Sequence, residues 1–489
     1  NPSYWLTRDR PPSITAIESM LQAAYLQAND KKYNSADLMQ LFETVAPATW
    51  RALVVPEQDM ILSAFEIPQF QQGLRLKEAT LLDGSIHGYD AALFRRLVQE
   101  AAKRSNGRKP RVAFVTSAAS NNFDAVDFYR DLLQQAGADV IWWPVDASMN
   151  AAIFGKQGCD ALPNLRQQIF SQLGRERVFP DLNDQQRQAC IQADQLAQVP
   201  LQVDALFLDG GDQWLHWNTF FSTDGQPNLW LQNIRTAYQK GELVVAGTSA
   251  GTAVQSSPVM ITNGTLGNAL KRGAKQYAGM PEGCDQAMRC PENMLEDDFT
   301  YWPQAGFALA GQLIMDTHVS KRNRELRLLT LLNTVQADAG IGTDETSAVI
   351  LRFEKTKTHI ESLGMSGAWW FMKPNLSDEP GSYSLKAHYL APGKILQWQN
   401  GKMQAMDTPS FQVKPNTPSK TSDVSEPNAM RDAVWNMVIN QSSSAKLNAY
   451  GHNIQITSTA DSKYWQGPEH QQGITDLHIE VSRVNTIDN

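Results

Sequence analysis

The sequence predicts an α/β fold in which a mostly parallel sheet is sandwiched between helices. From residue 79 onward, short apolar segments alternate with segments whose apolar residues recur at helical spacing. Strands separated in this way pair in parallel through right-handed crossovers. Two of the apolar segments end in glycine-rich turns, at residues 209–213 and 247–251. Ligands of open α/β sheets bind beyond the carboxyl ends of strands, so these turns are where a site is expected.

Composition limits the class of protein. The chain has 489 residues, of which 42% are hydrophobic and 19% are charged. This hydrophobic content is enough for a large core, and the length corresponds to two or three structural units. The net charge of −8, without a basic run interleaved with aromatic residues, argues against nucleic acid as a partner. No apolar run approaches the roughly 20 residues that cross a bilayer, so no membrane partner is expected. The sequence has no Cys/His cluster at metal-ligand spacing, and we expect neither a metal nor a cofactor.

The four cysteines fall into two local pairs, Cys159 with Cys190 and Cys284 with Cys290. Two disulfides would fit a secreted or periplasmic protein, whereas four reduced cysteines would fit a cytosolic one. Pairing within each local pair leaves no cysteine over, so we expect both disulfides. The chain opens at Asn1-Pro2 without an initiator Met or a signal peptide, which leaves open whether a leader was removed, and we expect a secreted or periplasmic location.

The chain is expected to have three parts, which are an N-terminal helical extension over residues 1–74, an α/β core over 75–400 and a C-terminal extension over 401–489. The extension begins with predicted helices at 14–28, after a Pro-Pro-Ser start, and at 35–44. The core alternates predicted strands and helices in this order: strand 79–82, helix 89–102, strand 111–116, helix 123–136, strand 139–145, strand 203–208, helix 229–240 and strand 243–246.

An insertion over residues 148–200 interrupts the alternation. It contains Cys159, Cys190 and a helical run at 184–198, and a disulfide there is worth about 2 to 4 kcal/mol. Further strands are expected at 313–317 and 348–351. Beyond residue 400, a Pro- and Ser-rich linker at 410–428 precedes a helix at 429–438 and strands at 454–457 and 477–481, which we expect to pack back on the core.

The segment Leu243–Val254 has the pattern of a nucleophile elbow. An apolar strand ends before Gly247-Thr248-Ser249-Ala250-Gly251, and the small residues that follow can begin a helix. Side chains at Gly247 or Gly251 would crowd the sharp turn, in which glycine tolerates unusual backbone angles. The pattern predicts that the Ser249 hydroxyl points outward and that the Ala250 N–H faces developing negative charge.

The strand at 203–208 ends in Asp209-Gly210-Gly211-Asp212-Gln213. A Gly-Gly turn lets backbone N–H groups approach a substrate, so Gly211 is expected to supply the second oxyanion donor beside Ala250. Gln213 would then reach the substrate through its amide. The alternative is an ordinary Asp-Gly turn without a ligand.

A base and an acid are expected at two further strand ends. His318 ends an apolar run, and Glu345 lies in a loop that precedes the strand at 348–351. A serine hydroxyl becomes a good nucleophile when a histidine takes its proton, and a carboxylate fixes the tautomer of that histidine. Arg322, Arg324 and Arg327 follow His318 within nine residues, and guanidinium groups suit a substrate carboxylate.

These motifs, in this order, resemble the serine peptidase family that holds cyanophycinase and the aspartyl dipeptidases, and are closer to cyanophycinase. The similarity rests on Gly210–Gln213, Gly247–Gly251, Asp316-x-His318 with its three arginines, and Gly342-x-Asp344-Glu345, and it runs from about Leu81 to Pro392. It implies a flavodoxin-like sandwich related to class I glutamine amidotransferases. Cyanophycinases usually carry Gln where this chain has Thr317.

The resemblance implies a hydrolase that releases β-Asp-Arg dipeptides from one end of cyanophycin, a poly-aspartate with arginine on each side chain. Ser249 would be the nucleophile, His318 the base and Glu345 the orienting acid. The implied substrate pocket is lined by Gln213, Asp316, Thr317, Arg322, Arg324 and Arg327. The partners would be cyanophycin or Asp-containing peptides, and a second copy of the chain in a homodimer.

Three alternatives remain at this point. An aspartyl dipeptidase-like peptidase would share the family motifs. An α/β-hydrolase esterase also uses Gly-x-Ser-x-Gly, but its acid precedes its histidine, as Asp316 or Asp344 would precede His388. A noncatalytic module could keep the pocket to bind polyanionic or zwitterionic peptides, although binding alone has no need of a serine, a histidine and an acid together.

Overall fold

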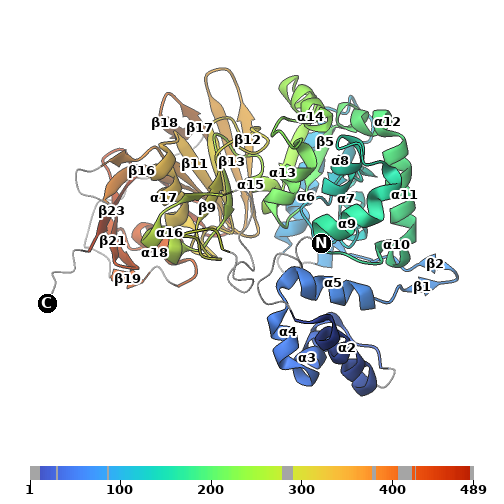
Figure 1. Cartoon of the computed structure of the whole chain (residues 1–489). Coiled ribbons are helices and arrows are strands. Elements are labelled where there is room, and N and C mark those ends of the chain that lie inside the picture. The colour runs from blue at the N-terminus through green and yellow to red at the C-terminus, as the bar shows by residue number, and fades with distance from the viewer. Residues whose placement is uncertain are drawn as a thin grey trace.

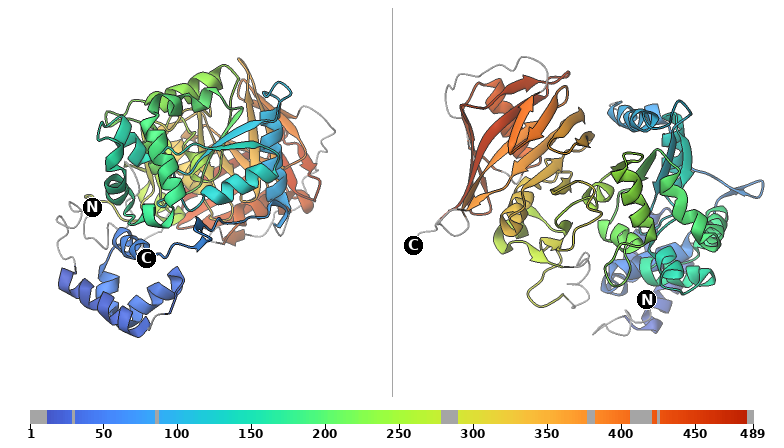
Figure 2. Two further views of the ribbon diagram at one scale, coloured as in Figure 1. Left: turned by 90° about the vertical axis from the view of Figure 1, so that its right-hand side faces the viewer. Right: turned by 90° about the horizontal axis from the view of Figure 1, so that it is seen from above.

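The computed structural model describes residues 12–28, 31–84, 88–277, 290–376, 382–405, 421–423 and 426–484. Two large units stand side by side, one built on a parallel sheet and one on mostly antiparallel sheets, and a small group of N-terminal helices lies beneath the first (Figures 1 and 2). Within the described ranges, no helix is long and apolar enough to cross a membrane.

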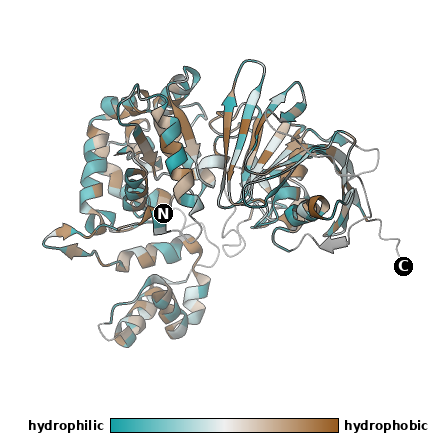
Figure 3. Cartoon of the chain, turned by 180° about the vertical axis from the view of Figure 1, so that it is seen from behind, coloured by the Kyte–Doolittle hydropathy of each residue, from teal (hydrophilic) through white to brown (hydrophobic). Residues whose placement is uncertain are grey.

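The N-terminal unit consists of helices α2 (Ile14–Ala28), α3 (Ser35–Val45), α4 (Pro47–Ala52) and α5 (Val55–Phe65). The predicted bounds of α2 are confirmed, and those of α3 differ by one residue. Its small core centres on Phe42, which stacks on Trp50 with ring centroids 4.8 Å apart. A two-stranded ribbon follows, β1 (Phe70–Gln71) and β2 (Leu74–Arg75), and projects with apolar residues in view (Figure 3).

The first large unit contains a four-stranded parallel sheet in the order β4 (Asp139–Trp142), β3 (Arg111–Val115), β5 (Ala205–Leu208), β6 (Val244–Gly247). Alternate strand residues face opposite layers. Ala113 and Leu206 pack on the layer that holds α13 (Gln213–Phe220) and α14 (Leu229–Gln239). Val112 and Phe207 pack on the layer that holds α6 (Tyr89–Ala102) and α7 (Val126–Gln135). The α/β prediction is therefore confirmed for this half of the chain.

The predicted strand at 79–82 is wrong. Only a short 3₁₀ turn, η1 (Leu82–Gly84), forms there. The N–H of Thr80 donates to the Asp131 carboxylate at 3.0 Å, and the N–H of Leu82 donates to the Gln135 side chain at 3.0 Å. Side chains of α7 therefore satisfy the backbone groups that a strand partner would otherwise bind.

The insertion is helical, and the disulfide between Cys159 and Cys190 is confirmed, with Cα atoms 5.8 Å apart. Its elements are α8 (Ala147–Ile153), η2 (Cys159–Ala161), α9 (Leu162–Phe170), α10 (Arg175–Val178), α11 (Pro180–Ile191), α12 (Ala193–Gln198) and η3 (Val199–Leu201). The single predicted helix at 184–198 is divided at Gln192, whose ψ of 42° is not helical. Cys290 is also disulfide-bonded, whereas Cys284 lies outside the described residues.

The second half of the chain differs from the prediction of one mostly parallel sheet. A ten-stranded sheet begins with the parallel pair β10 (Leu313–Thr317) and β11 (Ala339–Thr343), and is otherwise mostly antiparallel. It continues through β14 (Ala368–Met372), β16 (Tyr383–Leu390), β23 (Gln472–Arg483), β21 (His452–Ser458), β20 (Ser444–Ala449) and β19 (Thr421–Asp423), with β15 (Asn375–Leu376) and β22 (Tyr464–Gln466) at its side. The β20–β21 hairpin has a short connection through Tyr450 and Gly451, and such connections join antiparallel strands.

Smaller elements complete this second unit. One sheet has four antiparallel strands, β12 (Ser347–Phe353), β13 (Thr358–Gly364), β17 (Ile395–Gln399) and β18 (Lys402–Ala405). A three-stranded sheet has β9 (Thr300–Trp302) in the middle, antiparallel to β7 (Met260–Asn263) and parallel to β8 (Lys275–Gln276). Helices α17 (Glu325–Val335) and α18 (Ala429–Ile439) share a core with the large sheet. The predicted helix at 429–438 and both C-terminal strands are present, while residues 410–420 and 424–425 of the predicted linker lie outside the described residues.

Partly buried ion pairs join the two large units. Arg96 of α6 binds the Glu361 carboxylate on β13 through two nitrogens, at 2.9 and 2.8 Å. Arg352 of β12 reaches back to Glu100 of α6 at 2.8 Å. The four side chains are at most 35% exposed. Because two-nitrogen contacts of arginine with carboxylates have defined geometry, this pairing fixes how the parallel sheet faces the antiparallel one.

Candidate active site

Ser249 lies in the turn between β6 and the short helix α15 (Ala250–Ala253), with φ +48° and ψ −111°. Few residues other than glycine adopt a positive φ, and such strained positions cluster at functional sites. A Cβ on Gly247 would lie 2.2 Å from the carbonyl oxygen of Gly251, and a Cβ on Gly251 would lie 2.3 Å from that of Leu208. The two glycines are therefore what allows the strand, the serine and the helix to approach each other.

His318 and Glu345 follow neighbouring parallel strands. Thr317, the last residue of β10, is in register with Thr343, the last residue of β11, so the residues beyond both strand ends lie side by side. The His318 Nδ1 lies 2.8 Å from the Glu345 carboxylate, and its Nε2 lies 2.9 Å from the Ser249 hydroxyl oxygen. These are hydrogen-bond distances, and they connect three residues that are far apart in the sequence.

The environment of His318 favours a neutral imidazole. Burial lowers its pKa from the ordinary 6.5, Glu345 raises it, and the charges of Arg322 and Arg324 lower it further, with a net downward shift. Because a carboxylate can only accept, the His318 proton lies on Nδ1, and Nε2 is left to accept from the Ser249 hydroxyl. The imidazole is therefore placed to act as a base.

Asp344 links the two loops that carry His318 and Glu345. One oxygen of its carboxylate accepts from the N–H of Ser320 at 3.0 Å, and the other accepts from the Tyr389 hydroxyl at 2.8 Å. Burial raises the pKa of Asp344 above its ordinary value, and these hydrogen bonds oppose that change. The sequence does not reveal these partners, because Tyr389 reaches Asp344 from β16, which is separated from β11 by β14 in the sheet.

The Gly210-Gly211 turn lies against the serine. A Cβ on Gly210 would lie 3.4 Å from the Ser249 Cβ, and Gly211 has φ +145°, with no room for a Cβ because Ala118 O would be 2.2 Å away. The N–H of the next residue, Asp212, donates to that same carbonyl at 2.9 Å and fixes the turn. Among the described residues, the N–H groups of Gly211 and Ala250 have no backbone acceptor. Their role as oxyanion donors stays a prediction.

The residues predicted to line the pocket divide into two groups. Asp316 and Arg327 are at most 4% exposed and pair with each other through two bonds of 2.8 and 2.6 Å. Gln213 donates its amide hydrogens to the carbonyl oxygens of Ile261 and Thr262 on β7, at 2.8 and 2.9 Å. Thr317 is buried at 9% exposure. The structure therefore engages these four residues within the protein itself.

Arg322 and Arg324 lie closest to the histidine and glutamate. Arg322 is 53% exposed, with its Nε 4.0 Å from the Glu345 carboxylate. Arg324 donates to the carbonyl oxygen of Thr317 at 3.0 Å, and burial together with the Arg327 charge lowers its pKa to about 9, so it stays charged at neutral pH. Of the three predicted arginines, these two therefore have their guanidinium groups beside Glu345 and beside the residue that precedes His318.

The alternative histidine, His388, is not brought to Ser249. It lies on β16 at 1% exposure, and its Nδ1 accepts from the N–H of Asp476 at 3.0 Å. Burial lowers the pKa of His388 to about 3. Neither Asp316 nor Asp344 hydrogen-bonds to it, because Asp316 pairs with Arg327 and Asp344 binds Ser320 and Tyr389. The residue order that an α/β-hydrolase requires is thus not assembled.

Comparison with known proteins gives distant relatives. No protein-family model matches the sequence. The chain is 29% identical over 160 residues to a cyanophycinase from Geminocystis herdmanii, a match that covers 33% of this chain and 46% of the relative. It is 27% identical over 241 residues to cyanophycinases from Nostoc sp. and Trichormus variabilis, covering 48% of this chain and 66% of each relative. The matched part thus spans between about half and two thirds of these relatives.

One solved structure, a peptidase from an acI-B1 actinobacterium, covers 64% of this chain and 90% of its own, with a TM-score of 0.34 and 16% sequence identity. By sequence, the chain is a distant relative of curated cyanophycinases.

Proposed function

We propose that this protein is a serine peptidase that hydrolyses cyanophycin from one end and releases β-Asp-Arg dipeptides. The observation that carries the proposal is the chain of hydrogen bonds from Glu345 through His318 to Ser249, which sits on a strained turn with positive φ. The similarity to three curated cyanophycinases supports the choice of substrate. A module that only binds peptides would have no need of this arrangement.

The geometry gives each residue one task. His318 Nε2 takes the proton of the Ser249 hydroxyl, and the oxygen attacks the scissile carbonyl carbon, while Glu345 stabilises the imidazolium. The N–H groups of Ala250 and Gly211 stabilise the oxyanion. His318 then gives the proton to the leaving amine as the C–N bond breaks, which leaves an acyl-enzyme. A water molecule, activated by the same imidazole, hydrolyses that ester and regenerates Ser249.

Arg322 and Arg324 are the proposed contacts for substrate carboxylates. The buried pair of Asp316 and Arg327 supports them, since Arg324 lies 4.0 Å from the Asp316 carboxylate and donates to Thr317 next to the histidine. Losing a partner from a buried pair is costly, so the Asp316–Arg327 pair gives the site a rigid support. Recognition is left to the exposed Arg322 and the partly buried Arg324. We also propose a secreted or periplasmic location, which the Cys159–Cys190 disulfide supports.

The substrate is tested by incubating the purified protein with insoluble cyanophycin, poly-aspartate, α-Asp dipeptides and a short acyl ester, and identifying the products by mass. We expect β-Asp-Arg from cyanophycin and no product from the other three. Cleavage of α-Asp dipeptides without attack on the polymer would indicate an aspartyl dipeptidase. Turnover of the ester alone would indicate an esterase.

The dependence of activity on pH follows from the lowered pKa of His318. Only the neutral imidazole accepts a proton, so kcat/KM should be constant at neutral pH and fall on an acidic limb whose midpoint lies below the ordinary 6.5. Arg322→Gln should move this midpoint upward, because the Arg322 charge lowers the pKa of His318. Lys321→Gln, which removes a neighbouring exposed charge, is the control and should move it less. A midpoint unchanged in Arg322→Gln would contradict the assignment of this limb to His318.

A further inference from the structure

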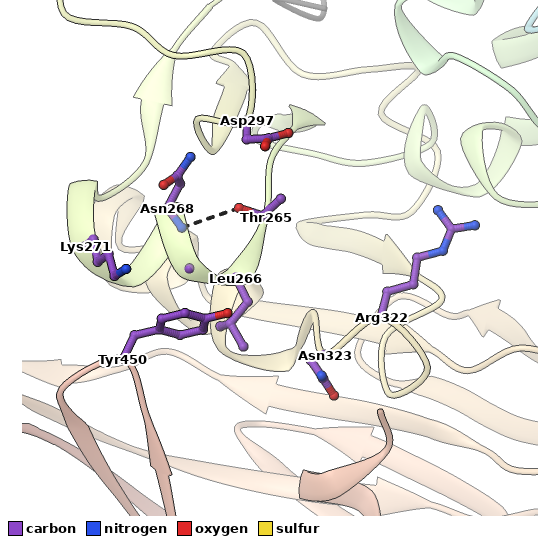
Figure 4. A pocket seen from close by; sticks show the side chains of 9 residues that line it. Thr265, Leu266, Asn268, Lys271, Asp297, Arg322, Asn323 and Tyr450 are labelled. Carbon is purple, nitrogen blue, oxygen red and sulfur yellow. Dashed lines mark hydrogen bonds between the residues drawn. The ribbon is translucent and has the colours of Figure 1, made fainter. Parts of the chain in front are cut away.

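A polar cavity of about 420 Å³ adjoins the site on the outer side of Arg322. Its walls come from α16 (Leu266–Arg272), the loop before β9, the turn after β10 and the turn between β20 and β21. Figure 4 shows Arg322 at one side and Lys271 with Tyr450 at the other. Arg322 lines the cavity and also lies 4.0 Å from the Glu345 carboxylate, so this side chain is shared between the cavity and the candidate active site. We call it the side cavity.

The charged groups of the side cavity are not neutralised by one another. The Lys271 ammonium lies 5.0 Å from the centroid of the Tyr450 ring, and no carboxylate of a described residue lies within 4.0 Å of it. Asp297 forms no ion pair within the described part of the chain and contributes its backbone carbonyl to the N–H of Thr265. Glu345, the carboxylate nearest to Arg322, is already engaged by His318. Two cations and one anion therefore face one small space.

We propose that the side cavity binds the unit of cyanophycin that lies beyond the two joined by the scissile bond, and this inference rests on the proposed function. Each unit carries one free carboxylate and one guanidinium. Lys271, at the end of the cavity away from Arg322, would bind the carboxylate, and Asp297 would bind the guanidinium. A purely cationic ligand would be repelled by the two basic groups, and a purely anionic one by Asp297. The volume is within the range of about 300 to 1,000 Å³ that small ligands occupy.

The local structure holds these groups in place. Thr265 caps α16 by accepting from the N–H of Asn268 at 3.4 Å, which sets the start of the helix that carries Lys271 (Figure 4). Gly267 faces the ring of Tyr450, where a Cβ would lie 3.2 Å from ring carbons. The Tyr450 face in turn attracts the Lys271 ammonium. Tyr450 belongs to the C-terminal segment beyond Pro392, so this segment contributes directly to substrate binding.

The test compares substrates of two lengths. Purified enzyme is given a dimer and a trimer of the β-Asp-Arg unit, and kcat/KM is measured for each. In Lys271→Gln the ratio of the trimer value to the dimer value should fall about tenfold, since one charge-assisted hydrogen bond is lost. Asp297→Asn should lower the same ratio, and Lys271→Arg should restore it. Lys446→Gln, on the exposed side of β20 and outside the cavity, is the matched control and should leave the ratio as in wild type.

The outcomes separate the two proposals. If wild-type enzyme releases no β-Asp-Arg from either oligomer, the substrate is wrong and the side-cavity proposal is overturned with it. If the wild type releases the product but Lys271→Gln and Asp297→Asn keep its ratio, only the side-cavity proposal is overturned. Melting temperatures of the variants, expected to match the wild type because Lys271 and Asp297 are exposed, show whether a lowered ratio comes from binding.

Discussion

Ser249→Ala is expected to reduce the release of β-Asp-Arg by roughly 10⁴- to 10⁶-fold, the range seen when a triad serine is removed from other peptidases. The hydroxyl oxygen is the atom that would form the acyl-enzyme, and within the described part of the chain it is the hydrogen-bond partner of His318 Nε2, at 2.9 Å. Product release should be measured by mass at saturating and at low concentrations of a soluble oligomer, because loss of chemistry lowers kcat rather than raising KM.

The control for this loss is Ser482→Ala, which removes a half-buried hydroxyl on β23, far from the elbow in sequence. It should keep wild-type activity. The Ser249→Ala protein should still bind the oligomer, since Arg322 and Arg324 are unchanged. Activity in Ser249→Ala close to that of wild type would show that another residue is the nucleophile, and the proposed mechanism would be abandoned.

Gly251→Ala is expected to destabilise the fold by roughly 3 kcal/mol, at the upper end of what overpacking costs. The new Cβ would lie 2.3 Å from the carbonyl oxygen of Leu208 and 2.7 Å from its carbonyl carbon, and backbone atoms of β5 cannot move aside as a flexible side chain can. Because β5 also leads into the Gly210-Gly211 turn, relief of the clash would displace the predicted oxyanion donors. Both a lower melting temperature and a loss of kcat are expected.

Gly241→Ala is the control that separates the cost of a positive φ from the cost of a steric clash. Gly241 has φ +75°, but a Cβ there would meet no heavy atom within 4 Å. This control should therefore carry only the cost of a left-handed residue, roughly 1 to 2 kcal/mol, with kcat unchanged. If Gly251→Ala and Gly241→Ala had equal melting temperatures and equal activities, the close approach of the elbow to β5 would be shown to matter neither for stability nor for activity.

Local patterns predicted much of the first half of the fold. The helices at 14–28 and 89–102 have the expected bounds because apolar spacing and helix starts are local properties. The strand at 79–82 was wrong because its backbone groups bind Asp131 and Gln135, which no local pattern reveals. The pairing of β16 with β23 joins residues almost 100 positions apart, so the antiparallel order of the large sheet was beyond reach of the sequence.

The candidate site shows the same division. Ser249, His318 and Glu345 were named from sequence because each belongs to a local pattern: a serine between two glycines, an apolar run that ends in histidine, and an acidic loop before a strand. Strand β11, which positions Glu345, was not expected because its residues were interpreted as part of that loop. The Asp316–Arg327 pair was expected to meet substrate, and its mutual engagement depends on how α17 packs against β10. Lys271 and Tyr450 gave no signal at all, since neither belongs to a motif and they meet only when the β20–β21 turn reaches α16.

The serine and its base belong to different sheets. Ser249 follows a strand of the four-stranded parallel sheet, whereas His318 and Glu345 follow strands of the ten-stranded sheet, and the contacts of Arg96 with Glu361 and of Arg352 with Glu100 hold the two units together. During synthesis, a chain whose first half has already folded would present the elbow with an unreactive hydroxyl. Under the proposed mechanism, Ser249 would become reactive only after the two units have docked. The rate at which a serine-directed phosphonate labels Ser249 would therefore measure the final docking step of folding.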